Sequence, residues 1–189
     1  MRIRFLTPVF CLSLLLVSFI SLAKPYELTV LTDKLDTPWA VATTFSDISS
    51  ETVFFITERS GSLRYFKDGE LSESVKGVPD VFFSGQGGLL DVQLHPDFSN
   101  NQILFLSLVS GDLSDNHLEV YSAVWNAAAN QLENVQSIFK VSPGKDTPVH
   151  FGARLTVLPD NTLMLASGDG FDYRESAQLN TSQLGKLLR

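Results

Sequence analysis

A β-hairpin pattern that occurs three times is the feature that most restricts how this chain can fold. Each copy has two apolar or alternating runs around a short polar turn, and the copies occupy 39–57, 88–111 and 152–170. Equivalent positions are 51 residues apart between the first two copies and 65 apart between the last two. Hairpin units that recur every roughly 40 to 50 residues are typical of β-propeller blades, and extra residues can lie in loops.

The segments between these hairpins also have strand character. The run SLRYFKDGEL has Asp68-Gly69 as a hairpin turn, and EVYSAVWNAAANQLENVQSIFKV has two runs around 127–131. The alternating stretch from Tyr26 to Thr32 predicts another strand, and only Ser176 to Leu188 has helix-like spacing, enough for a turn or a short helix. The sequence therefore predicts an all-β fold of about three propeller blades.

A closed propeller usually has four to eight blades, so three blades would leave apolar faces and strand edges uncovered. The sequence thus indicates a fragment or a truncated reading frame. In a full ring, the strand at 26–32 would close the last blade, and it would have no partner here.

The N-terminus indicates export. A short basic start is followed by an apolar stretch from Phe5 to Leu22 and by small residues that end at Ala23, which predicts a signal peptide at 1–23. A single-pass anchor is the alternative, since about eighteen apolar residues approach the length of a membrane span. Cleavage would remove Cys11, the only cysteine, and leave 24–189 without thiol chemistry. We expect a periplasmic or secreted protein without stable membrane insertion, and the formal charge of −7 argues against nucleic-acid binding.

The third hairpin carries the strongest candidate for chemistry. His150 precedes it and Asp169 follows it in a Gly-Asp-Gly turn, so the hairpin should bring both side chains to one rim. An imidazole held by a carboxylate is a common pair of general base and orienting group. The alternatives are a loop histidine bonded to the backbone and an ordinary turn aspartate.

Other polar residues near the hairpins have weaker signals. Gln86 lies on a glycine-flanked loop, where its amide could contact a flat ligand or a sugar hydroxyl, although Gly-Gln-Gly-Gly alone is more often a bend. Arg154 and Asp91 are assigned to structure: the arginine could pair with a carboxylate across the sheet, and the aspartate, if buried, must be hydrogen-bonded.

The remaining histidines and acidic residues do not predict a metal site. His95 and His117 lack metal-ligand spacing; the former is assigned to packing at a turn and the latter to a polar loop. That loop also contains Asp112 and Asp115, but it lacks the EF-hand order, so a solvated loop is the better interpretation.

The segments HFGARL, LPDNTLMLASGDG and AQLNTSQLGKLLR, together with GVPDVFFSGQGGLLDVQLHPDF upstream, resemble the soluble aldose sugar dehydrogenases. The resemblance runs from about Leu28 to Arg189. It implies a six-bladed β-propeller, with pyrroloquinoline quinone and calcium as cofactors, that oxidises aldoses at the anomeric carbon to lactones. It implies His150 as the general base and a cofactor contact, and Gln86 as a contact to cofactor and sugar. Electrons would pass to an external acceptor, either a cytochrome or a quinone.

Two departures from the family bear on activity. Ala153 stands where the family usually has glycine, and the family's Arg-Asn pair and calcium ligands are expected beyond residue 189. We therefore expect the 189-residue chain by itself to be inactive. A non-catalytic propeller that binds carbohydrate or protein, and a propeller sugar lactonase, are the alternatives, because one fold can support many functions.

Overall fold

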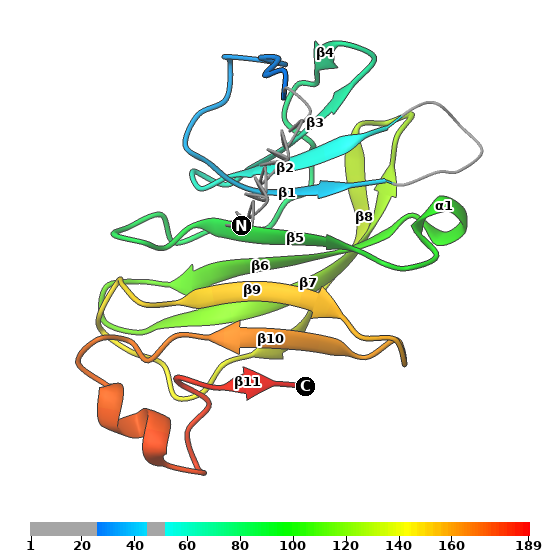
Figure 1. Cartoon of the computed structure of the whole chain (residues 1–189). Helices are drawn as coiled ribbons and strands as arrows, with labels where there is room; N and C mark the ends of the chain where they lie inside the picture. The colour runs from blue at the N-terminus through cyan, green and yellow to red at the C-terminus, as the bar shows by residue number, and fades with distance from the viewer. Residues whose placement is uncertain (1–25, 45–51) are drawn as a thin grey trace, which may run out of the picture. The chain divides into compact units, whose positions relative to one another are not determined.

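The computed structural model describes residues 26–44 and 52–189, and most of its regular structure is β-strand (Figure 1). The predicted signal peptide, and Phe45 at the end of the first predicted run, lie outside the described residues. The chain divides into a unit of 1–30 and a unit of 31–189, and every strand belongs to the second.

The second unit contains three antiparallel sheets in which consecutive strands are neighbours. The first sheet has the order β1 (Pro38–Thr43), β2 (Phe54–Glu58), β3 (Ser62–Lys67) and β4 (Glu70–Leu71). The second has the order β5 (Leu89–Leu94), β6 (Ile103–Gly111), β7 (Asn116–Asn126) and β8 (Gln131–Lys140), with the short helix α1 (Phe98–Asn101) between its first two strands. The third has the order β11 (Leu187–Leu188), β10 (Leu163–Ser167) and β9 (Gly152–Val157), and the 3-10 turn η1 (Arg174–Gln178) precedes β11.

This arrangement confirms the three predicted hairpins. They are β1–β2, β5–β6 and β9–β10. The first strand of each hairpin lies at the edge of its sheet that faces the neighbouring sheets, since β1 and β9 both contact β5. The two further hairpins are also present, as β3–β4 and β7–β8. The sheets correspond to two four-stranded blades and one three-stranded blade, as expected for about three blades.

Two apolar clusters hold the sheets together. Between the first and second sheets, Phe55 and Trp125 meet edge to face with ring centroids 4.8 Å apart, and Phe98 stacks on the tryptophan. Between the second and third sheets, buried residues such as Leu90 and Leu155 form the other cluster. Strand β5 contributes to both clusters, which explains why five of its six residues are buried, Asp91 among them.

The β3–β4 turn offers a test of local backbone conformation. Asp68 and Gly69 both have positive φ, 53° and 84°, as a type I′ turn requires. A Cβ at Gly69 would meet no atom within 4 Å, so a substitution there changes backbone preference alone. We expect Gly69→Ala to lower the free energy of unfolding by about 1 kcal/mol, measured by urea denaturation. Asp68→Asn should be neutral because asparagine tolerates the same φ; equal midpoints for the two variants would contradict this explanation.

Two local predictions need correction, and a third agrees with the structure. The segment at 26–32 is not a strand, because no strand in the described part of the chain supplies the hydrogen bonds that an alternating pattern needs. The turn or short helix predicted within 176–188 is present as the 3-10 turn η1, which begins slightly earlier, at Arg174, and is followed by the two-residue strand β11. His117 lies within β7 rather than in the preceding loop, since it pairs with Ser110 of β6.

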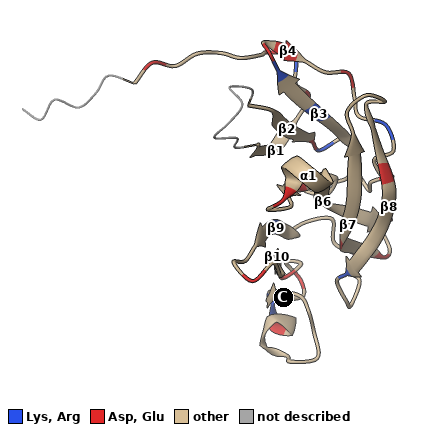
Figure 2. Cartoon of the chain, turned by 90° about the vertical axis from the view of Figure 1, so that its right-hand side faces the viewer, with Lys and Arg blue, Asp and Glu red and all other residues tan. Residues whose placement is uncertain are grey.

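Charged residues are dispersed over the fold. In Figure 2 the acidic and basic positions lie mainly on loops and on outer strands such as β4 and β8, without a basic patch in that view. None of the described helices has the length and hydropathy that a membrane crossing requires.

Candidate functional site

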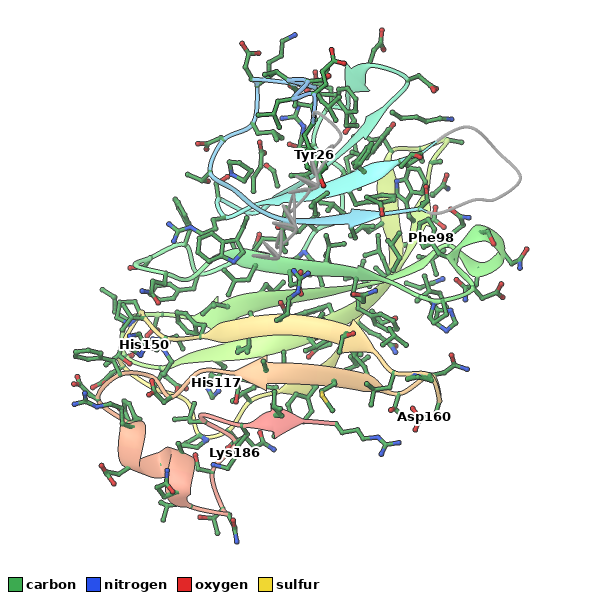
Figure 3. The ribbon with its side chains drawn as sticks, in the orientation of Figure 1. Tyr26, Phe98, His117, His150, Asp160 and Lys186 are labelled. Carbon is green, nitrogen blue, oxygen red and sulfur yellow. The ribbon has the colours of Figure 1, made fainter. Side chains whose placement is uncertain are left out.

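The candidate site lies at one end of the β9–β10 hairpin, where the loop before β9 meets the turn after β10. Ser167 pairs with Gly152, and beyond this pair Gly168 N–H donates to the carbonyl of Phe151 at 2.7 Å. These bonds continue the ladder past the strands and bring the two predicted site residues together. His150 and Asp160 mark opposite ends of the hairpin (Figure 3).

His150 and Asp169 form a direct pair. Nδ1 of His150 lies 2.8 Å from Oδ1 of Asp169, and the same oxygen accepts the N–H of Phe171 at 3.0 Å. These two hydrogen bonds, the backbone one first, lower the pKa of Asp169. An ionised carboxylate can only accept, so Nδ1 carries the proton in this pair, and in the neutral form of the ring Nε2 has the lone pair. The imidazole is 41% exposed, which leaves it accessible to a ligand.

Gln86 contacts the same loop through both its side chain and its backbone. Its side-chain Oε1 accepts the backbone N–H of His150 at 2.8 Å, and its backbone N–H donates to the carbonyl of Pro148 at 2.8 Å. Because the oxygen is engaged, the amide NH₂ is the group that can face a ligand. The neighbouring glycine has a structural role, since a Cβ on Gly85 would lie 2.3 Å from the Pro148 carbonyl oxygen.

Phe171 is a site residue that the sequence did not indicate. Its ring meets the imidazole of His150 edge to face at a centroid distance of 5.1 Å, and the guanidinium of Arg174 lies 5.3 Å from its centroid. Phe171 has a φ of 66°, so the chain turns back over the histidine directly after Gly170. The aromatic residue that follows Gly-Asp-Gly was the available signal.

Arg154 and Asp91 have the structural role that was predicted for them. Nη1 of Arg154 lies 3.1 Å from Oδ1 of Asp91, which connects the inner strands of the second and third sheets. The other carboxylate oxygen accepts the N–H of Leu155 at 2.7 Å. Burial raises the pKa of Asp91, although the Leu155 hydrogen bond and Arg154 oppose this effect.

Ala153 occupies a backbone conformation that favours glycine. Its φ is 86°, it is buried, and its carbonyl accepts a hydrogen bond from Oγ of Ser107 at 2.7 Å. The alanine that replaces the family's usual glycine at this position is therefore under backbone strain.

The other polar residues do not extend the site. His95 accepts the N–H of Asp97 through Nδ1, a turn contact, and His117 lies between Asp115 and the Val141 carbonyl. Asp112 is engaged by Ser114 and by backbone N–H groups, which lower its pKa. Across 26–44 and 52–189, no three His, Cys, Asp or Glu side chains are grouped as metal ligands would be.

An open cavity of about 570 Å³ lies beside the pair. His150, Asp169 and Lys186 line it, and glycines form part of its wall: Gly152, Gly168 and Gly185. The arrangement therefore combines a base, an orienting carboxylate and space for a ligand.

Comparison with known proteins places this geometry in context. The family model described as Glucose / Sorbosone dehydrogenase matches residues 35–189. The aldose sugar dehydrogenase of Escherichia coli is 36% identical over 98% of this chain and 48% of its own length. An uncharacterized Synechocystis protein is 38% identical over 83% of this chain and 41% of its own length.

Solved structures agree with the sequence comparison. The apo-form of the soluble aldose sugar dehydrogenase from Escherichia coli matches with a TM-score of 0.74 and 36% identity, over 85% of this chain and 45% of that one. The PQQ-bound aldose sugar dehydrogenase from Streptomyces coelicolor matches with a TM-score of 0.72 and 25% identity, over 86% and 46%. The chain spans about half the length of the curated relatives that it matches.

Proposed function

Since this chain belongs to the glucose/sorbosone dehydrogenase family, we propose that it forms part of a quinone-dependent enzyme that oxidises the anomeric hydroxyl of an aldose to the lactone. The observation that carries the proposal is the accessible imidazole of His150, whose Nδ1 is held by Asp169. A neutral imidazole of this kind can accept a proton at Nε2 near neutral pH.

His150 would remove the hydroxyl proton while the hydrogen on C1 leaves with its bonding electrons. The C1–O single bond becomes the lactone carbonyl, and the proton is held at Nε2 of His150. Asp169 keeps the ring oriented and stabilises the imidazolium that forms. Phe171 packs against the imidazole and restricts its rotation.

A donor amide beside an open, glycine-lined cavity fits a flat quinone with several oxygen atoms. The amide NH₂ of Gln86 would donate to a quinone oxygen, the imidazole of His150 would contact the ring, and the cavity has room for a planar ligand. Pyrroloquinoline quinone, when bound, would supply the two-electron acceptor for the oxidation. Across 26–44 and 52–189 no three His, Cys, Asp or Glu side chains are grouped as metal ligands would be, so we propose that the carboxylate ligands of calcium come from another part of the protein.

We further propose that the protein works outside the cytoplasm and passes electrons to a cytochrome or to a quinone. The support for export is the N-terminal sequence of a short basic start, an apolar stretch and small residues at a cleavage position.

The direct test uses the complete enzyme of which this chain is proposed to form part, purified with and without the quinone and calcium. We expect aldose-dependent reduction of a dye only when both are supplied. Thermal stabilisation by sugar without dye reduction would indicate a carbohydrate-binding propeller instead. Hydrolysis of a sugar lactone without added quinone would indicate a lactonase.

Removal of the Asp169 charge tests the orienting role. We expect Asp169→Asn to lower kcat by roughly tenfold to a hundredfold with little change in KM, because the amide can present its NH₂ to Nδ1 and favour the wrong tautomer. Steady-state dye reduction measures the effect. Asp160→Asn is the matched control, since Asp160 lies at the far end of the same hairpin; equal kcat values for the two variants would refute the role.

A further inference from the structure

We propose that Lys145 is a positioning residue that orients His150 by donating hydrogen bonds to carbonyl groups of the loop before β9. The inference deepens the proposed function and rests on it, because it concerns the direction of the group assigned as the base.

Lys145 is buried, with only 4% of its surface exposed, which is rare for lysine. Its Nζ donates to the carbonyl of Thr147, to the carbonyl of Val149 at 2.8 Å and to Oδ1 of Asn116 at 3.2 Å. It also lies 3.5 Å from the ring centroid of Phe151. All three donors of the ammonium group therefore have oxygen partners, and two of these belong to the residues just before His150.

The lysine is itself anchored to the second sheet. Asn116, at the start of β7, is fully buried and exchanges two backbone hydrogen bonds with Lys145, at 2.8 and 3.1 Å. Its side-chain NH₂ donates to the carbonyl of Asp112. The ammonium group thus connects the loop of the third sheet to a rigid strand of its neighbour.

Lys145 also packs beneath the turn that carries Asp169. A Cβ on Gly170 would lie 2.7 Å from Cδ of Lys145, and Oγ1 of Thr147 donates to the Gly170 carbonyl at 2.7 Å. The same side chain therefore contacts both segments that form the histidine–aspartate pair.

The chemistry of this contact requires a cation with several donors. His150 has a φ of 54°, so its side-chain direction depends on how the preceding peptide groups are held. An apolar side chain of similar length would fill the space but leave the Thr147 and Val149 carbonyls without their donor. The loop would then change conformation so that these carbonyls find other donors, and the imidazole would turn away from Asp169.

Burial lowers the pKa of Lys145 to about 8, while Asp146 raises it. The charge that holds the carbonyls is therefore lost as the pH rises through this value. The other ionisable groups around it are Asp146 on the same loop, His117 of β7, which lines the same small cavity as Lys145 and His150, and Asp169 across the turn. An effect on the loop with a midpoint near pH 8 would thus follow the charge of the lysine.

The experiment compares Lys145→Met with Lys140→Met by NMR of ¹⁵N-histidine-labelled protein and by steady-state kinetics. Lys140 is half-exposed on β8 and pairs with Glu119 at 3.0 Å, so its loss is the matched control. In Lys145→Met we expect the Nδ1 signal of His150 to lose the signature of its hydrogen bond, and kcat to fall roughly tenfold to a hundredfold with nearly constant KM. A folded Lys145→Met variant with an unchanged His150 signal would overturn the proposal.

If Lys145→Met does not fold, the unchanged protein still answers the question. The carbonyl ¹³C signals of Thr147 and Val149 should shift with a midpoint near pH 8, and constant signals between pH 7 and about 9.5 would overturn the inference. The two hypotheses fail separately. Full activity of a His150→Ala variant would refute the proposal that His150 is the base. The NMR results test the role of Lys145 whether or not the enzyme is active.

Discussion

Replacement of His150 by alanine is expected to lower kcat of the quinone-loaded enzyme by roughly 10²- to 10⁴-fold, the usual contribution of a positioned general base. The substitution removes the imidazole but keeps the backbone N–H that donates to Gln86, so the loop retains that anchor. Dye reduction with a saturating aldose measures kcat, and circular dichroism checks that the variant is folded.

His95→Ala is the control for this experiment. His95 is a partly exposed histidine whose Nδ1 accepts the N–H of Asp97 in a turn, and it has no part in the proposed chemistry. We expect its kcat to stay within about twofold of the unchanged enzyme, as surface contacts of this kind contribute little. If His150→Ala retained the same kcat as His95→Ala, another residue would have to be the base.

The largest expected effect on stability concerns Asp91. We expect Asp91→Ala to lower the free energy of unfolding by about 2 to 3 kcal/mol, because the buried N–H of Leu155 loses its acceptor and the link between β5 and β9 is broken. Urea denaturation followed by tryptophan fluorescence measures the loss.

Arg154→Ala separates the buried hydrogen bond from the ion pair. The arginine side chain is 71% exposed, so its removal should cost less than about 1 kcal/mol. A larger loss for Arg154→Ala than for Asp91→Ala would show that the ion pair dominates.

Since burial raises the pKa of Asp91, the folded state binds a proton at this carboxyl group more tightly than the unfolded state does. The contribution of this group to stability therefore decreases as the pH rises through the raised pKa, and Asp91→Asn should lack that pH dependence.

The hairpins could be predicted because their signals are local. Asp68-Gly69 supplies the positive φ angles that a two-residue turn needs, and 127–130 connects two long runs that pair as β7 and β8. The same reasoning was wrong at 26–32, where alternation favours an extended chain but a strand also requires a partner. Periodicity describes a single segment, whereas pairing depends on two.

The candidate site was predictable in part for the same reason. A hairpin of known register brings its two ends together, so the meeting of His150 and Asp169 follows from the sequence between them. The contact of Gln86 with the His150 backbone joins residues 64 positions apart and was not predicted, because the resemblance to a family implied only that Gln86 contacts the cofactor and the sugar. Lys145 was missed because a lysine in a polar loop has no sequence signal of burial.

The sequence by itself determined the strands, the tight turns and the pairing within each hairpin, because backbone preference and side-chain alternation act over a few residues. Only the tertiary structure decided that the ammonium group of Lys145 lies beneath the histidine loop and that Asp91 accepts the N–H of Leu155. Both contacts join segments of neighbouring sheets. Their physical cause is the packing of sheet against sheet, which excludes water and obliges each enclosed charge and carbonyl to find a partner wherever the chain happens to bring one.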